Sequence, residues 1–475
     1  MLYIVNDQKQ TTKGLPVMKY SKSTVHRKYF SFPTLCFETQ RLTSFSGLIL
    51  FQRFFDTIGL VEKLRFCYRH LRVNPIFGHT KATLLLIIQF ILGFRHFNYL
   101  RYFGNDPLVK RLTGLSLMPD PTTVSRILSS ADKKSVEKLH TLARTLVTDH
   151  LSSNTVRRIT ADFDGSVIST RRHAENTAVG FNKKKKGMRS YYPLFCTIAQ
   201  TGQVFDWLHR PGNVHDSHGA VEFVDHCFSM LGCYAPHAIF ESRMDGAFFS
   251  EKMVLMHEDW GTEYSISVPF ERLVELKMMI EQRGTWRRID KNVSYFDAWW
   301  SPQCWGRDYR FIFVRTRTHV INKEPIQLDL FEPREYGYEY KVILTNKKTT
   351  AQNVIAFHNG RGSQEGIFAE LKSQLNIDCI PFKRLIPNQI YLASGIIAHN
   401  LCRSFQIMTK QKTQRTSFGR CTHWVFEQIG TVRRNIINRA GRITNPHGTY
   451  TLTISGNKEI KREYLETLDA LDKAA

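Results

Sequence analysis

The feature that most constrains the fold is a change in the period of the apolar residues near Arg157. Before it, apolar residues recur at helical spacing, and five of them share one face: Leu84, Ile87, Ile88, Ile91 and Leu92. Beyond Arg157 they alternate with polar residues from Ile159 to Val167, which is the pattern of a strand with one apolar face. The chain therefore predicts a mainly helical part followed by an α/β part.

Further strand and helix patterns follow in an order that is typical of one topology. Tyr191–Ala199 and Val204–Leu208 predict two strands joined by the turn signal Thr201-Gly202. A helical stretch, a strand over His237–Ser242 and a helix ending near Gly261 come next. Three strands in a meander, followed by helix, strand and helix, indicate the start of an RNase H-like α/β fold.

The remaining segments complete the predicted domain organisation. Residues 262–340 break the scheme with short β-like runs and many aromatics, so we interpret them as a β-rich insertion. Lys341–Thr345 resumes a core strand, and Ser363–Leu375 and Ile390–Met408 predict apolar helices. The resulting division is a basic flexible arm (1–31), a helical N-terminal DNA-binding domain (32–155), the first part of the RNase H-like core (156–261), the insertion (262–340), the second part of the core (341–400) and a basic, helical C-terminal region (401–475).

The charge balance favours a nucleic acid as the partner. The chain has 66 Lys and Arg against 42 Asp and Glu, a net charge of +24. Each phosphate that such a surface neutralises releases condensed counterions, which drives binding to a polyanion. The most apolar run, Leu84–Leu92, is far shorter than the roughly 20 residues of a bilayer span, so no membrane segment is predicted. Nine scattered cysteines without a Cys-x-x-Cys pair favour a reducing cytoplasm over disulfides or structural zinc.

Three carboxylates fall at positions that this fold brings together. Asp164 lies in the first strand, Asp245 just after the fourth, and Glu365 on the late helix. Such oxygen ligands suit Mg²⁺, and two ions about 3.5–4 Å apart can activate an attacking oxygen and stabilise a leaving one. We predict that these residues bind two Mg²⁺ ions, with Mn²⁺ able to replace them. Asp162 shares a strand face with Asp164 and stays an alternative to it, and Asp245 could instead cap the helix at Ala247.

The helix around Glu365 also carries cations at helical spacing. Arg361, Glu365, Phe368 and Lys372 form one stripe if the helix extends back to Arg361. Cations beside a metal-binding glutamate can hold the phosphates of the strand that is cut. An ordinary Arg–Glu ion pair on the surface is the alternative.

These residues resemble the DDE transposases of bacterial insertion sequences, in the branch with a Tyr-x2-Arg-x3-Glu-x6-Lys signature. Here the signature reads His358-x2-Arg361-x3-Glu365-x6-Lys372, with His358 at the tyrosine position. The resemblance is to the insertion sequence 1380 group in particular and runs from about Leu42 to Thr453. Five further motifs carry it: Asp162-Phe-Asp-Gly-Ser166, Tyr192-Pro-Leu194, Arg210-Pro-Gly-Asn213, Arg243-Met-Asp-Gly-Ala-Phe248 and Pro119-Asp-Pro-Thr-Thr123.

The resemblance implies a DNA transposase that cleaves at the terminal inverted repeats of its element and joins the 3′-OH ends to target DNA. It also implies double-stranded DNA as the partner, a homodimer in the DNA complex, and a bacterial, cytoplasmic protein that is bound to the nucleoid when it holds DNA. Two alternatives stay open. One is an RNase H-like nuclease that acts on other nucleic acid, and the other is a DNA-binding protein descended from a transposase that no longer cuts.

Several basic and aromatic residues are candidates for DNA contact. The basic ones are His358, Arg361, Lys372, Lys183, Lys184, Lys185, Lys186, Arg189 and Arg126. Arg126 lies on a helix predicted to begin near Pro119, with Thr122 or Thr123 as its cap. In some relatives a tryptophan of the insertion stacks on a flipped base, so Trp299 and Trp300 are candidates for that role. The alternatives are a solvated face for the lysines, core packing for the tryptophans and an ordinary helical bundle around Arg126.

Overall fold

The structure is a computed structural model. It describes residues 40–72, 77–151, 156–180, 185–215, 217–302, 305–317, 337–411 and 419–474. The chain divides into the units Met1–Gln40 and Arg41–Ala475, and the described helices and strands lie in the second. The predicted arm 1–31, Lys183 and Lys184 lie outside the described residues. Helices and strands alternate in the second unit, so the predicted mixed α/β class is confirmed.

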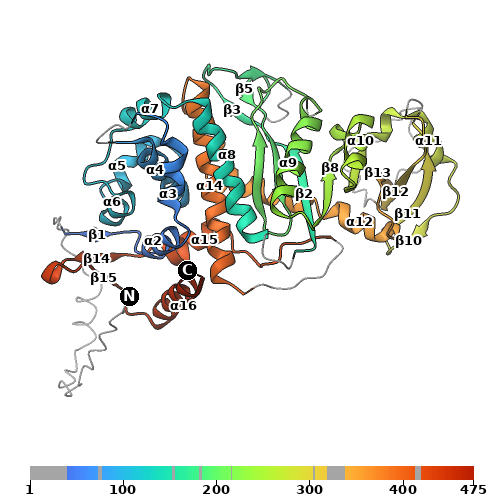
Figure 1. Ribbon diagram of the computed structural model, residues 1–475. Helices are drawn as coiled ribbons and strands as arrows, with labels where there is room; N and C mark the ends of the chain where they lie inside the picture. The colour runs from blue at the N-terminus through green and yellow to red at the C-terminus, as the bar shows by residue number, and fades with distance from the viewer. Residues whose placement is uncertain are drawn as a thin grey trace, which may run out of the picture. The chain divides into compact units, whose positions relative to one another are not determined.

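A nine-stranded mixed sheet forms the α/β part, in the order β10-β11-β12-β13-β9-β8-β2-β6-β7 (Figure 1). β2 pairs antiparallel with β6, which pairs antiparallel with β7, and β8 and β9 continue in parallel on the other side of β2. The elements concerned are β2 (Arg158–Gly165), β6 (Leu194–Ile198), β7 (Gln203–Leu208), α9 (Ala220–Tyr234), β8 (Ile239–Met244), α10 (Glu251–Asp259) and β9 (Glu263–Val268). The predicted sequence of three antiparallel strands, helix, strand and helix is therefore observed.

The segment predicted as an insertion continues this same sheet. β9 lies at its start and pairs in parallel with β8, so the parallel part of the sheet extends past residue 261. Antiparallel strands then follow at the edge beyond β9. Together with α11 (Val274–Glu281) they are β10 (Arg287–Arg288), β11 (Val293–Trp300), β12 (Tyr309–Arg317) and β13 (Tyr338–Thr345). Strand character is readable in the sequence here, but the partner of each strand is not.

A small sheet follows β2 directly, in the order β3-β5-β4. Its strands are β3 (Ile168–Thr170), β4 (Ala178–Val179) and β5 (Arg189–Tyr191). This sheet lies between β2 and β6 in the chain, and the lysine run 183–186 lies between β4 and β5 in the sequence. Lys185 and Lys186 are exposed at the start of the return to β5.

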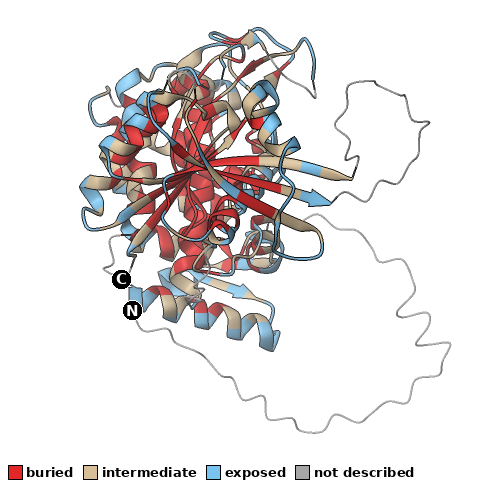
Figure 2. Cartoon of the chain, turned by 90° about the vertical axis from the view of Figure 1, so that its right-hand side faces the viewer, coloured by how far each residue is buried: buried red, intermediate tan, exposed pale blue. Residues whose placement is uncertain are grey.

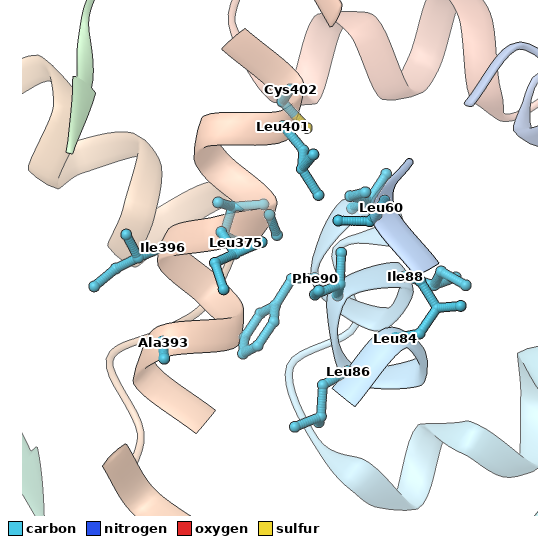
Figure 3. Packing of buried hydrophobic residues seen from close by; sticks show 14 of the residues in the cluster. Leu60, Leu84, Leu86, Ile88, Phe90, Leu375, Ala393, Ile396, Leu401 and Cys402 are labelled. Atoms are coloured by element: carbon cyan, nitrogen blue, oxygen red, sulfur yellow. The ribbon is translucent and has the colours of Figure 1, made fainter. Parts of the chain in front are cut away.

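The helical part shares one apolar core with the last helices of the chain. One cluster of buried residues includes Leu48 and Phe90 of the first helices and Tyr391 and Leu471 of the last ones, and Phe90 packs against Tyr391 with ring centroids 4.9 Å apart. Figure 3 shows Phe90 directed from α4 toward α14, and Figure 2 shows the buried residues along the sheet and the helices beside it. The helices are α2 (Leu48–Thr57), α3 (Leu60–Tyr68), α4 (His79–Leu92), α5 (Leu100–Phe103), α6 (Pro107–Thr113), α7 (Pro121–Ser129), α8 (Lys133–Leu151), α14 (Leu385–Thr409), α15 (Ile429–Val432) and α16 (Lys458–Ala474).

Among the described helices, no single one is long and apolar enough to cross a membrane. His79–Leu92 and Phe97–Phe103 meet the criteria only as a pair, across a bend of 89°. β1 (Leu42–Thr43), β14 (Gly441–Thr444) and β15 (Thr451–Ile454) form a third, three-stranded sheet.

Helix α7, which carries Arg126, begins differently from the prediction. Asp120 caps it, since its Oδ1 accepts a hydrogen bond from the Thr122 amide at 2.8 Å. The prediction that Thr122 or Thr123 is the cap is wrong, because Pro121 takes the first helical position, which suits its fixed φ and missing N–H. The apolar face of α7 is buried and consists of Val124, Ile127 and Leu128.

The polar face of β2 is buried under a layer of paired charges. The parallel register places Thr160 beside Glu241 and Asp162 beside Arg243. Glu241 is fully buried and accepts hydrogen bonds from Thr160 Oγ1 at 2.9 Å, Arg158 Nη1 at 2.8 Å and Lys347 Nζ at 2.7 Å. Arg420 Nε adds a fourth at 2.9 Å. A buried carboxylate with this many donors is stabilised in its charged form.

We expect Glu241→Gln to lower the free energy of unfolding by about 3 kcal/mol at pH 7. Burial raises the pKa of Glu241, but hydrogen bonds from Arg420 and Lys347 outweigh burial and lower the pKa from its ordinary 4.5 to about 2. A depressed carboxyl pKa contributes stability that is present above the ordinary value and is lost as pH falls through the lower one. The difference between variant and wild type should therefore shrink between pH 5 and pH 2.

Urea unfolding at pH 7, 5 and 3 measures this difference. The matched control is Glu459→Gln, because Glu459 lies on the exposed face of α16 with a side chain that is 73% exposed. A Glu241→Gln penalty that is equally large at pH 7 and pH 3 would contradict the prediction.

Candidate active site

Asp164 and Asp245 meet at the ends of two adjacent parallel strands. The register of β2 and β8 pairs Phe163 with Met244, so the two aspartates follow side by side. Arg361 Nη1 lies 3.6 Å from Asp164 Oδ2 and 3.9 Å from Asp245 Oδ2. The side chains are 27% and 51% exposed, respectively, so solvent and a substrate can reach both carboxylates. The site thus joins two predicted acids and one predicted cation.

Each aspartate is oriented by its own backbone. The Gly165 amide donates to Asp164 Oδ1 at 2.7 Å, and the Gly246 amide donates to Asp245 Oδ1 at 2.5 Å. Asp245 is the N-cap of the short turn η2 (Gly246–Phe248), whereas Ser250 caps α10. Capping does not compete with a role in the site, because it uses Oδ1 and leaves Oδ2 facing Arg361.

Asp162, the alternative to Asp164, lies in the interior. It is 1% exposed, and Arg243 binds both of its oxygens: Nε donates to Oδ1, and Nη2 donates to Oδ2 at 2.6 Å. Arg243 is itself fully buried and also donates to the carbonyl of Gly419 at 2.7 Å. The structure therefore places Asp164, and not Asp162, beside Asp245.

Glu365 lies exposed on α13 (Gly362–Ala369), one helical turn beyond Arg361. Gln364 ties this helix to β2, since its Nε2 donates to the carbonyl of Asp162 at 2.9 Å. Within the described ranges, no three His, Cys, Asp or Glu side chains lie close enough to hold one metal ion. Glu365 therefore does not complete a three-carboxylate set with Asp164 and Asp245 in this conformation.

The helix of Glu365 ends in a π-helical turn, η4 (Glu370–Gln374), where a regular helix to Leu375 was predicted. The turn is anchored by buried side chains. Glu370 accepts hydrogen bonds from Arg403 Nη2 and, at 3.3 Å, from the Ile429 amide. Arg433, at the start of the π-helical η5 (Arg433–Ile437), donates to the carbonyls of Gln374 at 2.9 Å and Ile91 at 2.8 Å. Two arginines of the predicted basic C-terminal region thus fix the end of the helix that carries Glu365 and Lys372.

His358, at the tyrosine position of the signature, is fully buried. Its Nε2 and Nδ1 lie 2.9 Å from Ser267 Oγ and 3.0 Å from Ser265 Oγ, both on β9. Burial lowers the pKa of His358 well below its ordinary value, and Lys341, Arg361 and Arg243 lower it further, so the ring is neutral at pH 7. His358 holds α12 (Ala351–Asn359) on β9, with both ring nitrogens at serine hydroxyls.

We expect His358→Phe to destabilise the protein by about 1–3 kcal/mol, because the hydroxyls of buried Ser265 and half-buried Ser267 lose their partner. DNA affinity and its salt dependence should stay at wild-type values, since the neutral imidazole contributes no charge. Chemical unfolding and fluorescence anisotropy with labelled DNA measure the two quantities. In the matched variant, Ser265→Ala and Ser267→Ala are added, which removes the orphaned hydroxyls and should recover part of the stability. A weaker salt dependence without loss of stability would instead indicate a direct phosphate contact.

The remaining basic candidates fall into two groups. Arg126, Lys185 and Lys186 are exposed, and Lys372 is half-buried within η4. Arg189 is half-buried and donates to the Thr177 carbonyl and, at 3.0 Å, to Thr177 Oγ1, so it braces the small sheet.

The two tryptophan candidates differ in their surroundings. Trp299 is 68% exposed, whereas Trp300 packs edge-on against Phe311 with ring centroids 5.1 Å apart. Trp299 pairs with Arg310, Arg310 with Thr345, and Thr345 with Ser265 on β9. Ser265 in turn pairs with Arg243, two residues before Asp245, so Trp299 lies on the same sheet face as the aspartates. Four strand spacings separate β11 from β8, about 19 Å across the sheet. Core packing therefore describes Trp300, and Trp299 has a free ring at a distance from the carboxylates.

Lys341 is a site residue that the sequence did not single out. It lies near the start of β13, two residues before Ile343, which pairs with Ser267. Lys341 is therefore on the same sheet face as Ser267. Burial lowers the pKa of Lys341, and so does Arg361, whereas Asp245 raises it. It is thus a second cation near the carboxylates. The sequence shows a basic residue at the start of a predicted strand. It does not show that this strand pairs with β9, and without that pairing Lys341 cannot be placed near the carboxylates.

One family model matches the chain over residues 34–475, and its description is "Transposase DDE domain group 1". No protein with a curated description matches. A cryo-EM structure of the piggyBac transposase synaptic complex with hairpin DNA is 12% identical, with a TM-score of 0.42 over 82% of this chain and 79% of that one. The Mos1 transposase paired-end complex with left transposon end is 10% identical, with a TM-score of 0.17 over 41% and 60%.

Proposed function

This chain belongs to group 1 of the transposase DDE domain family, and from that premise we propose that it cleaves DNA at the terminal inverted repeats of its own element and joins the 3′-OH ends to target DNA. Membership supports a role in DNA transposition in general. The observation that carries the finer proposal is the pair Asp164 and Asp245 at adjacent strand ends, with Arg361 between them. The motifs quoted from the sequence support placement in the Tyr-Arg-Glu-Lys branch and near the insertion sequence 1380 group.

The strand order supports an RNase H-like core. Three antiparallel strands, β7-β6-β2, continue into the parallel strands β8 and β9. In this arrangement the carboxyl ends of β2 and β8 lie at one edge, and each carries an aspartate at its end. The antiparallel strands β10–β13 extend the sheet beyond the core.

The donor set fits a hard divalent cation. Asp164 and Asp245 offer carboxylate oxygens, which are the ligands that such a cation prefers. The Oδ2 atoms of both lie near the same atom, Arg361 Nη1. Asp164, Asp245 and Glu365 would hold two Mg²⁺ ions, with Mn²⁺ able to replace them. When bound, such ions activate the attacking oxygen and stabilise the leaving oxygen of a phosphodiester.

Glu365 would join Asp164 and Asp245 by a shift of the first turns of α13, in which the hydrogen bond from Gln364 to the Asp162 carbonyl breaks. Two glycines flank it, Gly362 and Gly366, and the space around both is open. Each glycine weakens the helix by about 1 kcal/mol relative to alanine, so this turn is easily deformed. The anchored π-turn that follows keeps the rest of the helix in place.

On substrate binding, Arg361 would leave Asp164 and Asp245 and bind a phosphate of the DNA. Its guanidinium now offsets the repulsion between Asp164 and Asp245, and a planar guanidinium binds a phosphate in two-point fashion. Lys341 adds positive charge on the same side, where the scissile phosphate would lie.

We assign DNA backbone contact to the exposed or half-buried cations Arg126, Lys185, Lys186 and Lys372, in addition to Arg361. Trp299 is the better candidate for base stacking, because its ring is exposed. The partner is double-stranded DNA, held by a homodimer that brings two element ends together, in the bacterial cytoplasm.

A cleavage assay with the DNA that flanks the gene tests the proposal. The full chain is mixed with a labelled duplex of the terminal repeat and a target plasmid in Mg²⁺, Mn²⁺ or EDTA. We expect nicking at the repeat boundary and joining of the 3′ end to the plasmid in either metal, and neither reaction in EDTA. Equal cutting of a scrambled duplex or of an RNA–DNA hybrid would favour a general nuclease. Tight binding without cutting would favour a DNA-binding protein that no longer cuts.

A further inference from the structure

A cavity of about 510 Å³ in the helical part has strongly cationic walls. It opens between α2, α3, α4 and α6, and it contains none of the residues of the candidate active site. Five basic side chains line it: Arg65, Arg69, Arg72, Lys81 and Arg111. A single carboxylate, Asp56, lies among them, so the lining carries a large excess of positive charge.

The contacts of these side chains within the protein do little to neutralise that charge. Arg65 pairs with Glu62 at 2.5 Å, on the exposed surface of α3. Arg69 and Arg111 lie over the rings of Phe66 and Tyr450, each 4.8 Å from the centroid, and Lys81 Nζ donates to the Gly114 carbonyl at 3.1 Å. These last three partners are neutral.

The N-terminus of α4 adds to the positive potential of the cavity. Gly78, the N-cap of this helix, has no side chain to accept from the first amides, and no side-chain cap is present. Gly78, His79, Thr80 and Lys81 all line the cavity. N–H groups without a side-chain cap at a helix start favour an anion, as do the five cations that line the same cavity.

We propose that this cavity binds phosphate groups of the DNA backbone, as a second anchoring site outside the catalytic centre. The proposal rests on the proposed function, which supplies DNA as the partner. Phosphate chemistry is common to DNA and to free phosphate compounds. DNA fits better, because Arg65, Arg69, Arg72 and Arg111 are exposed and reach outward. Such side chains hold a phosphate that stays attached to a chain outside the cavity, whereas a free ion is usually enclosed by buried donors.

Neutralising two of the cations tests the site. The double variant Arg69→Gln, Arg72→Gln is compared with the charge-matched double variant Lys133→Gln, Lys473→Gln, whose lysines are 86% and 75% exposed and do not line the cavity. Fluorescence anisotropy with the full chain and the terminal-repeat duplex gives the dissociation constant over a series of salt concentrations. For the cavity variant we expect a log–log salt slope that is lower by roughly 1–2, since each lost phosphate contact removes about 0.9. Affinity at low salt should fall about tenfold or more, with thermal stability unchanged.

Several outcomes would overturn the inference. Equal slopes and affinities for wild type and the cavity variant would exclude a phosphate contact there, and so would an equal loss in the control variant. Calorimetric titration with inorganic phosphate and with ATP distinguishes the sources of phosphate. Micromolar binding of either, lost in the cavity variant, would assign the site to a free phosphate compound and contradict the DNA proposal. If wild type binds and cuts the repeat and the cavity variant does so equally well, this inference is refuted and the proposed function stands. A wild-type chain that neither binds nor cuts the repeat refutes the proposed function.

Discussion

Asp164→Asn is expected to slow DNA strand cleavage about a thousandfold or more, while the protein stays folded and still binds the terminal repeat. The asparagine oxygen can still accept the Gly165 amide that now donates to Asp164 Oδ1, so the local backbone is kept. What is lost is the negative charge of Oδ2, the atom that faces Arg361 and Asp245. Single-turnover cleavage of a labelled repeat duplex in Mg²⁺ measures the rate.

Asp245→Asn and Glu365→Gln should cause losses of similar size. The matched control is Asp259→Asn, because Asp259 is exposed at the end of α10, away from the sheet edge of the site. A second readout separates ligand loss from other defects: Mg²⁺ should raise the melting temperature of wild type more than that of Asp164→Asn. Cleavage by Asp164→Asn at the wild-type rate would refute the site assignment.

Asp162→Asn changes the aspartate two residues earlier on the same strand face. We expect this variant to lose stability, whereas Asp164→Asn stays folded and loses the cleavage rate. Asp162→Asn leaves the fully buried guanidinium of Arg243 without its charged partner. Removal of one member of a buried pair costs about 3–5 kcal/mol, a large part of the 5–15 kcal/mol that holds a typical domain folded. The variant should unfold at much lower urea concentration, and its activity should be lost through unfolding.

A double substitution makes this prediction specific to the pair. In Asp162→Leu, Arg243→Met neither position carries a charge, so stability should recover in part relative to Asp162→Asn. Urea titrations monitored by tryptophan fluorescence give the free energy of unfolding of wild type and of both variants. If Asp162→Asn were as stable as wild type but inactive, and Asp164→Asn were active, the two aspartates would have exchanged roles.

The positions of Asp164 and Asp245 follow from local patterns in the sequence. Alternation places Asp164 late in one strand, the strand order puts a second strand beside it, and Asp245 follows that strand directly. These are short-range signals, each readable within about ten residues. Arg361 likewise follows from its spacing to Glu365, and the structure brings it to both aspartates.

The buried polar layer could not be read in the same way. Alternation along β2 predicts one solvent-facing side, yet Thr160 and Asp162 are buried. Their charged neighbours come from distant segments: Arg243 is 81 residues from Asp162, and Lys347 is 106 residues from Glu241. A single sequence does not show which distant cation neutralises which acid. For the same reason the π-turn at Glu370 was missed, because Arg403 and Ile429, which hold it, lie 33 and 59 residues away.

The single apolar core that joins α2–α8 to α14–α16 bears on how this protein can diversify. A recognition module that folds by itself can be exchanged between relatives by recombination, as a unit with its own interior. Here α4 packs on α14, and Arg433 binds carbonyls at the end of α4, so an exchange of the N-terminal helices would leave the remainder with half an interior. We expect lineages of this protein to acquire new DNA ends by point changes on the helical surface, and chimeras joined near residue 155 to lack cooperative unfolding in a urea titration.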